Sequence, residues 1–278
     1  MFAASHLVDA VELKLPPLVP SPKTFTFNLG PHLSDDQRSR ALSPLEAFRH
    51  ICATDISQCT RSCVYEASLP LKPDHIVRWI PQYRLSPPEL DHAQEYVAQL
   101  LKYGVIVEGS SCYNSPLFCI PKRKDKPSDP TVYRVILSLK AVNSSCLKRT
   151  NFALPSIPDL LSNLAGKSWH SSFDLTSSFH QVNLTMESSK VCSFSLQGKQ
   201  YLFRRLPLGV NSAVHLLSSI LAKALEGLFF QEVFGFVDDL FCSTHTIDQM
   251  LDLLRRTFEK LDTAHLYLNP LKSSFFYG

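Results

Sequence analysis

Two adjacent carboxylates, Asp238 and Asp239, lie inside an apolar run that extends from Val233 to Phe241. Burying two neighbouring negative charges among phenylalanine, valine and leucine side chains is costly unless a positive charge sits between them. Hard divalent cations such as Mg²⁺ bind carboxylate oxygens and keep open positions for phosphate. The pattern predicts a strand, a tight turn at Asp238-Asp239 and a returning strand. An ordinary turn without metal chemistry also fits this window.

A third carboxylate, Asp174, ends a similar β-prone approach at residues 169–173 and precedes a small-residue turn at residues 176–178. Two strand-end carboxylate sites are suited to hold two metal ions about 4 Å apart, an arrangement that stabilises the attacking and leaving oxygens of phosphoryl transfer. Taken alone, Asp174 is equally consistent with a helix N-cap that follows a strand.

Basic side chains are concentrated in one segment, although the formal net charge of +3 is too small to indicate a nucleic-acid partner by itself. Residues 121–150 contain only two acidic residues, Asp125 and Asp129, against eight basic ones: Lys122, Arg123, Lys124, Lys126, Arg134, Lys140, Lys148 and Arg149. Such a cluster suits a phosphate backbone. A solvated loop is the commoner meaning of a Lys-Arg-Lys run.

Composition describes a globular chain of 278 residues with 45% hydrophobic and 19% charged residues. The eight cysteines have no repeated spacing, and Cys119, Cys192 and Cys242 are predicted to be core residues in a reduced compartment. A zinc site among His50 and the cysteines at 52, 59 and 63 matches no zinc-knuckle spacing. The sequence has no long apolar run or signal pattern, so we expect an intracellular protein that is not secreted.

Local signals predict the elements that would position these residues. Ser86-Pro87-Pro88-Glu89 predicts the start of a helix that ends at Gly104, and Thr246 with Gln249 predicts another capping box. Further helices are expected at residues 156–164 and 211–228, strands at residues 105–107, 117–121 and 132–139, and a hairpin at residues 192–206 around Gln197-Gly198.

The first 68 residues have the weakest signals. A proline-rich stretch at residues 15–22 predicts an extended linker, and Ser43-Pro-Leu-Glu46 predicts a capping box that opens a short helix through His50.

Four segments in order carry a family resemblance: Tyr133 to Asn143 (YRVILSLKAVN), Phe173 to Val182 (FDLTSSFHQV), Leu206 to Asn211 (LPLGVN) and Phe236 to Asp239 (FVDD). Together they resemble the reverse transcriptase of LTR retrotransposons, most closely the gypsy type. The resemblance runs from about Leu69 to Gly278. It implies an α+β right-hand polymerase with fingers at about 85–150 and a palm at about 151–278. The palm would be a split βαβ, ferredoxin-like sheet with helices on one face.

The resemblance implies an RNA-directed DNA polymerase that adds deoxynucleotides to a primer 3′-hydroxyl on an RNA or DNA template. It assigns Mg²⁺, with Mn²⁺ as a substitute, to Asp174, Asp238 and the main-chain carbonyl of Leu175, while Asp239 adjusts the field. Lys272 matches a lysine that protonates pyrophosphate. Arg134, together with Arg123 or Lys124, would contact the triphosphate, Phe179 the sugar, and Gly209 the nucleotide through close backbone approach. Core packing is the alternative for Phe179, and a plain turn for Gly209.

Departures from the family pattern affect several positions. Ser138 and Lys140 replace an acidic residue and an arginine, Phe236 replaces a tyrosine, and Leu208 and Val214 are also unusual. The family continues past the position of Gly278 into a thumb and RNase H, so we expect a fragment of a polyprotein, with residues 1–68 as its connecting sequence, or a decaying element. A retrotransposon particle or the nucleus is the expected location.

Two alternatives stay open. A viral RNA-directed RNA polymerase is disfavoured, because Val237 precedes the aspartate pair and Phe179 would block a 2′-hydroxyl. An inactive relic that retains the fold or weak nucleic-acid binding is the other.

Overall fold

Five strands form the sheet that carries the acidic residues, in the order β1-β12-β6-β11-β10. The computed structural model describes residues 25–123, 131–148, 158, 162 and 164–278. Strand β6 lies at the centre and is antiparallel to both β11 and β12. The strands are β1 (Asn28–Leu29), β6 (Trp169–Leu175), β10 (Val233–Phe236), β11 (Asp239–Thr244) and β12 (Leu268–Tyr277).

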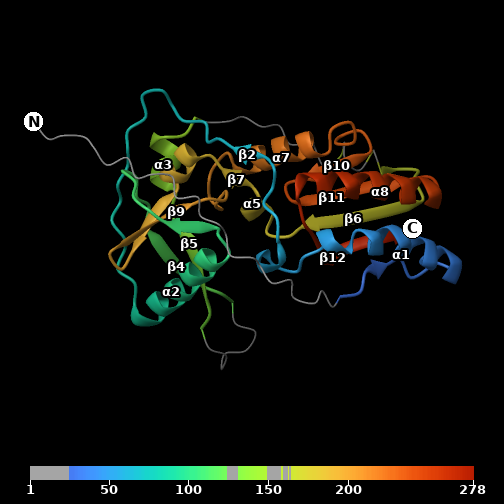
Figure 1. The fold of residues 1–278 in the computed structure, drawn as a ribbon, viewed down its shortest axis with the longest axis horizontal. Helices are drawn as coiled ribbons and strands as arrows, with labels where there is room; N and C mark the ends of the chain where they lie inside the picture. The colour runs from blue at the N-terminus through green and yellow to red at the C-terminus, as the bar shows by residue number, and fades with distance from the viewer. Residues whose placement is uncertain (1–24, 124–130, 149–157, 159–161, 163) are drawn as a thin grey trace, which may run out of the picture.

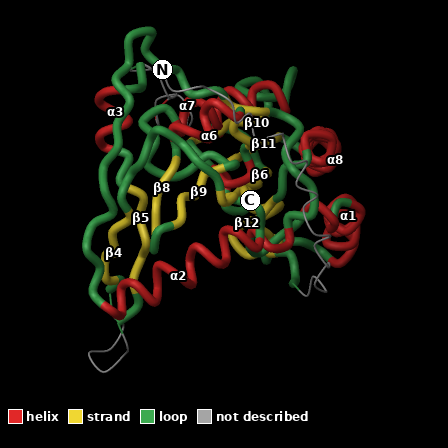
Figure 2. The backbone as a smooth tube through the Cα atoms, turned by 60° about the vertical axis from the view of Figure 1, so that its left-hand side comes forward, coloured by secondary structure: helices red, strands yellow, loops and turns green. Residues whose placement is uncertain are grey.

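Helices α8 (Ile247–Ala264) and α1 (Asp35–Ala47) lie side by side on one side of this sheet (Figure 2). Thr246 and Gln249 form the predicted capping box at the start of α8, and its apolar stripe places Phe258 edge-on to Phe173 of β6 and Phe275 of β12. Helix α7 (Ala213–Ala224) contacts α8. The chain order β6-α7-β10-β11-α8-β12 is therefore the predicted split βαβ arrangement.

Shorter sheets form the other half of the molecule, on the left in Figure 1. Strands β3 (Ile106–Glu108), β9 (Lys199–Phe203) and β8 (Ser193–Leu196) form one sheet, and β4 (Leu117–Pro121) pairs with β5 (Tyr133–Leu137) in another. Because β3 pairs with β9, one sheet joins a segment predicted for the fingers to one predicted for the palm. The remaining helices here are α2 (Pro87–Lys102), α3 (Lys140–Ser145) and α6 (Met186–Val191).

Local signals explain the ends of α2. Ser86 and Glu89 form the predicted capping box with a proline at the first helical position, and Gly104 follows the helix with a φ of 62°. The β8–β9 hairpin turns at Gln197-Gly198, as predicted, and both turn residues have positive φ. The helix predicted at residues 156–164 falls largely outside the described residues.

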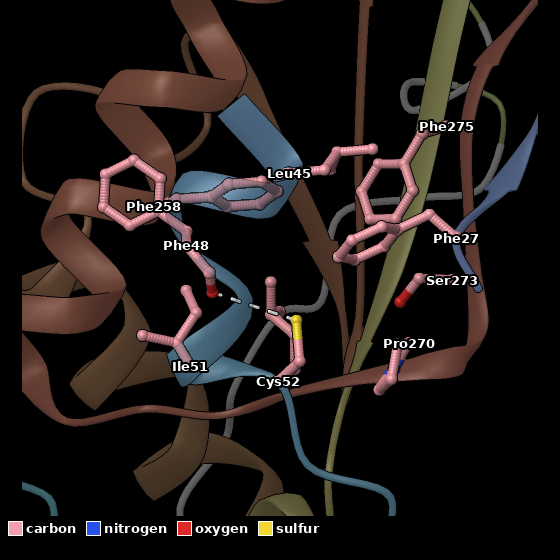
Figure 3. A pocket seen from close by; sticks show the side chains of 10 residues that line it. Phe27, Leu45, Phe48, Ile51, Cys52, Phe258, Pro270, Ser273 and Phe275 are labelled. Carbon is pink, nitrogen blue, oxygen red and sulfur yellow. Dashed lines mark hydrogen bonds between the residues drawn. The ribbon is translucent and has the colours of Figure 1, made fainter. Parts of the chain in front are cut away.

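Residues 25–68, predicted as connecting sequence, are instead folded onto the palm. Strand β1 pairs with β12, α1 contacts α8, and β2 (Glu66–Ala67) pairs with β7 (Asn183–Leu184). Phe48 lies beside Phe258 and Phe27 beside Phe275 (Figure 3). The ring centroids of these two pairs are 5.9 and 6.1 Å apart. The apolar residues that pack here are scattered along the segment, so no periodic sequence pattern predicts their burial.

The helix predicted to begin at Ser43 begins earlier. Ser34 accepts a hydrogen bond from the Gln37 amide, and the Gln37 side chain accepts one from the Ser34 amide, so this pair forms the real capping box. Pro44 lies inside α1, where it removes one helical hydrogen bond without ending the helix. The prediction at Ser43 was wrong because two box-like patterns compete, and the earlier one satisfies the free amides of the first turn. None of the described helices has the length and apolarity needed to span a membrane.

Candidate active site

The three aspartates singled out in the sequence meet at one end of the large sheet. Asp174 on β6 and Asp239 on β11 are directly opposed partners in the antiparallel ladder. Asp238 lies in the turn before β11, and its main-chain oxygen accepts a hydrogen bond of 3.4 Å from the Leu175 amide. Residues that are far apart in sequence therefore meet at the same strand ends.

The hairpin that carries Asp238 turns one residue earlier than predicted. Phe236 pairs with Asp239, so Val237 and Asp238 are the two central residues of the turn, and Asp239 begins the returning strand. Val237 has a φ of 63°, a left-handed conformation that is unfavourable for a β-branched residue. The register of β11 against β6 decides this turn, because Asp239 must lie opposite Asp174 for the two apolar faces to match.

The aspartates differ in exposure and repel one another. Asp174 is buried, with 7% of its surface exposed, whereas Asp239 is exposed. Burial raises the pKa of Asp174, the Lys272 ammonium opposes that rise, and the charges of Asp238 and Asp239 add to it. Burial and the charge of Asp238 likewise raise the pKa of Asp239. The cluster therefore favours a cation that would offset its negative charge.

Lys272 provides one such cation. Its Nζ lies 3.5 Å from Asp174 Oδ2, although its own side chain is 66% exposed. It reaches this position from an irregular part of β12, where the register against β6 shifts between Asn269 and Ser274. Within this bulge, Ser273 Oγ accepts a hydrogen bond of 3.3 Å from the Asp174 amide and donates one of 2.6 Å to the Asn269 carbonyl.

Ser273 and Asn269 were missed in the sequence, since a bulge of this kind has no local signature. They support the strand end that carries Asp174.

A divalent cation is compatible with the donors at this site. Carboxylate oxygens at the ends of two paired strands, next to main-chain carbonyls, are the ligands that Mg²⁺ and Mn²⁺ take. In the conformation observed, no group of three or more His, Cys, Asp or Glu side chains among the described residues is gathered closely enough to hold a metal ion. Asp174 instead forms an ion pair with Lys272.

Phe179 lies on α5 (Ser178–Gln181), a single helical turn that begins just after the strand carrying Asp174. Its side chain is partly buried and packs against the core. The neighbouring Gln181 is buried, and its carboxamide bonds to the main chain of Thr176 and Tyr267. Sequence reasoning did not single out Gln181, because a glutamine within a motif does not reveal which main-chain groups it bonds.

Gly209 occupies a loop that only glycine adopts readily, with a φ of 100°. The Asn143 side chain of α3 forms two hydrogen bonds to this loop. Its Nδ2 donates one of 2.7 Å to the Gly209 carbonyl, and its Oδ1 accepts one of 3.0 Å from the Asn211 amide. An open cleft of about 750 Å³ lies alongside, and Leu139, Asn143 and Asn211 are among its lining residues.

The predicted triphosphate contacts are not gathered with the aspartates. Arg134 is exposed on β5 and Arg123 is exposed two residues after β4, and these two strands form a different sheet from the one that carries the aspartates. In Figure 1, β4 and β5 lie in the half of the molecule opposite β11. Lys124 lies outside the described residues.

Comparison with known proteins agrees with this architecture. Residues 120–277 match the family model described as reverse transcriptase (RNA-dependent DNA polymerase). The chain is 32% identical over 254 residues to the Retrovirus-related Pol polyprotein from transposon 412 of Drosophila melanogaster, a match that covers 91% of this chain and 20% of that protein. It is 28% identical to the corresponding polyprotein of the gypsy transposon, over 67% of this chain and 18% of the relative.

Solved structures show the same fold. The foamy viral protease-reverse transcriptase in complex with RNA/DNA hybrid superposes with a TM-score of 0.74 at 21% identity, covering 88% of this chain and 32% of that one. A related foamy viral structure in complex with double-stranded DNA gives a TM-score of 0.73 at 22% identity, covering 88% and 41%. The chain thus spans about a fifth of the curated relatives' length and less than half of these structures. It belongs to the reverse transcriptase family, as a domain of the kind found in retrotransposon and retroviral Pol polyproteins.

Proposed function

We propose that this chain is an RNA-directed DNA polymerase that transfers deoxynucleotides to a primer 3′-hydroxyl. The observation that carries the proposal is the opposition of Asp174 and Asp239 across β6 and β11, with Asp238 in the adjoining turn. The hydrogen-bonded ladder of β6 and β11 holds these aspartates at one end of the sheet. A polymerase needs its metal-binding carboxylates preorganised in this way.

Asp174, Asp238 and the Leu175 carbonyl are the proposed ligands of two divalent cations, Mg²⁺ or Mn²⁺, with Asp239 adjusting the local field. When bound, these ions would lower the pKa of the primer hydroxyl and offset charge on the departing pyrophosphate. Asp174 is held in register by β11 on one side and by Asn269 of β12 on the other. The main chain that carries this carboxylate is therefore held on both sides.

The other proposed roles belong to groups around the aspartates. Lys272 carries the positive charge nearest to Asp174 and donates a proton to the leaving pyrophosphate. Phe179 packs against the deoxyribose and excludes a 2′-hydroxyl by its shape. Gly209 leaves room for the nucleotide at the loop that Asn143 holds. Arg134 with Arg123 or Lys124 binds the triphosphate, which requires the β4–β5 hairpin to approach the palm.

The proposed nucleic-acid partner is an RNA or DNA template with its primer. Support comes from the foamy viral relatives, whose structures contain double-stranded DNA or RNA/DNA hybrid. In this chain Lys122, Arg123 and Arg134 are exposed on or beside the β4–β5 hairpin, where they add positive charge for phosphate contact.

Primer extension tests the proposal directly. A labelled primer on an RNA template is incubated with the protein, the four deoxynucleoside triphosphates and either Mg²⁺ or Mn²⁺. We expect extension by the wild-type chain and none by Asp238→Asn, whereas Asp91→Asn on the exposed face of α2 keeps wild-type activity. Loss of extension in all three proteins would reject the proposed activity.

A second candidate function is binding of nucleic acid without synthesis. The observation that favours it is the ion pair between Asp174 and Lys272, which offsets the charge of a proposed metal ligand. Its signature is salt-sensitive retention of template-primer, since phosphate contacts dominate such binding, with no nucleotide addition in either metal.

A further inference from the structure

The turn that follows the strand bearing Asp174 is held by hydrogen bonds to residues far away in the sequence. The Thr176 amide donates a hydrogen bond of 3.0 Å to the Tyr267 carbonyl, and the Thr176 hydroxyl donates one of 2.5 Å to the Ala53 carbonyl. Ser177 then adopts a left-handed φ of 46°, and α5 begins at the next residue. Phe179, on this short helix, is therefore connected to Asp174 by only one tightly fixed turn.

Gln181 closes this turn from the other end of α5. The residue is 3% exposed. Its Nε2 donates a hydrogen bond of 2.6 Å to the Thr176 carbonyl and one of 2.9 Å to the Tyr267 carbonyl. Oε1 accepts 2.7 Å from the Tyr267 amide. Every polar atom of this buried carboxamide is thus bonded to main chain, so removing it leaves buried groups unsatisfied.

Tyr267 leads directly into β12, where Leu268 pairs with Leu175 and Asn269 with Asp174. Gln181 therefore joins α5 to the strand that runs beside Asp174.

Arg205 extends the connection to the N-terminal part of the chain. Its Nη1 donates a hydrogen bond of 3.0 Å to the Gln181 carbonyl, and its Nη2 donates one of 2.7 Å to Ser62 Oγ. Within the described part of the chain Arg205 forms no ion pair with a carboxylate, and burial lowers its pKa. The Ser62 carbonyl is itself bonded to His265 Nδ1 at 2.9 Å, close to the start of β12. Arg205 thus ties the end of α5 to Ser62, and Ser62 is in turn hydrogen-bonded to His265, just before β12.

We propose that Gln181 and Arg205 are positioning residues that set how far Phe179 stands from Asp174, and thereby set selection for deoxyribose over ribose. This inference rests on the function proposed above. Exclusion of one hydroxyl by a ring depends on placement within about 0.5 Å, so α5 must be held rigidly. The aspartates are held separately by the β6–β11 ladder. Loosening α5 therefore lets the ring retreat while the chemistry of nucleotide addition continues.

The test compares single-nucleotide addition of a deoxynucleotide and of the matching ribonucleotide. Gln181→Met keeps the side-chain length but removes both polar atoms. We expect it to lower the ratio of kcat/KM for the deoxynucleotide to kcat/KM for the ribonucleotide about tenfold, chiefly through a lower KM for the ribonucleotide. Arg205→Lys and Ser62→Ala act at the edge of the network and should lower the ratio about threefold. Thr257→Val removes a buried hydroxyl whose hydrogen bond, in the part of the chain that the structure describes, goes to the Leu253 carbonyl within α8, and it should leave the ratio unchanged.

A readout independent of turnover accompanies these assays. Amide hydrogen exchange at Thr176 and Tyr267 should speed up in Gln181→Met and not in Thr257→Val, because both amides belong to the network.

An unchanged sugar ratio in Gln181→Met would overturn the inference and leave Gln181 a purely structural residue. Should Gln181→Met fail to fold, an unchanged ratio in both Arg205→Lys and Ser62→Ala overturns it equally. Failure of the proposed function looks different, because the wild-type chain would then add neither nucleotide. Failure of the role given to Phe179 also looks different, because Phe179→Ala would then discriminate as well as wild type.

Discussion

Asp174 and Asp239 face each other as opposed residues of neighbouring antiparallel strands, and Asp238 is tied to the same strand end through its main-chain oxygen. Backbone hydrogen bonds thus place the main chain of all three residues. Their negative charges repel one another, and Lys272 offsets part of that repulsion at Asp174. Substitutions there should change charge and leave the architecture intact.

Asp174→Asn should stabilise the metal-free protein at neutral pH. Burial raises the folded-state pKa of Asp174 above its unfolded value, so the folded state binds the proton more tightly. Stability from this group is present at low pH and is lost as pH rises from the unfolded pKa of about 3.9 through the folded one. Urea unfolding in EDTA at pH 7 measures the gain, which should vanish below about pH 3.5. A less stable variant at pH 7 would contradict this expectation.

Lys272→Met should tighten binding of Mn²⁺ while slowing nucleotide addition. The ammonium offsets the charge of Asp174, and because Lys272 itself is exposed to solvent we value this ion pair at about 0.2 to 1 kcal/mol, equivalent to at most about a fivefold change in affinity. Calorimetry or electron paramagnetic resonance measures Mn²⁺ binding, and Lys223→Met on the exposed side of α7 is the control. Weaker Mn²⁺ binding in Lys272→Met would show that Lys272 does not compete with the cation.

Phe179→Ala should admit ribonucleotides, because the ring would no longer collide with a 2′-hydroxyl. We expect the kcat/KM preference for deoxynucleotides to fall about a hundredfold, the scale on which loss of close steric placement acts. Single-turnover addition of each nucleotide measures the preference. Phe230→Ala, an exposed aromatic in the turn before β10, should discriminate like wild type. Equal discrimination by both variants would make Phe179 a core residue only.

Val237→Gly should stabilise the fold by about 1 kcal/mol, because glycine removes the left-handed strain of a β-branched residue. The same change should slow nucleotide addition, since the turn that carries Asp238 becomes more flexible. Gln197→Gly provides a matched control: Gln197 also has positive φ in a hairpin turn, that of β8 and β9, and its replacement should raise stability without slowing addition. Denaturation midpoints and primer extension measure the two effects, and unchanged activity in Val237→Gly would argue against a role for the strained turn.

His180 should make the fold sensitive to mild acid. Burial lowers its pKa to about 4, with a further contribution from Arg205. Between pH 4 and 6.5 the unfolded chain binds a proton that the folded chain does not, so stability falls as pH drops through this window. After allowance for partial exposure, the loss should be about 2 kcal/mol.

Urea unfolding between pH 4 and 7 should show this loss in wild type and in His245→Gln, whose histidine is exposed, and a smaller loss in His180→Gln. Equal pH dependence in all three proteins would exclude His180 as its source.

The sequence alone was sufficient for features that depend on near neighbours. Ser86 with Glu89 and Thr246 with Gln249 predicted two helix starts correctly, because a capping box is completed within four residues. The strands flanking Asp174 and Asp239 were predictable for a similar reason, since an apolar run that ends in a carboxylate already favours a buried strand with a polar tip. The motifs built on these strands were also enough to indicate the family.

Tertiary structure decided what depends on distant partners. Pairing with β6 placed the turn at Val237 and Asp238, because register is set by the neighbouring strand. A bulge in β12 brought Lys272 beside Asp174, and the buried carboxamide of Gln181 found its partners 86 residues away at Tyr267. Residues 25–68 became part of the core because scattered apolar side chains gain burial only once α8 and β12 are in place. These contacts join segments that no local pattern relates, so only the folded chain reveals them.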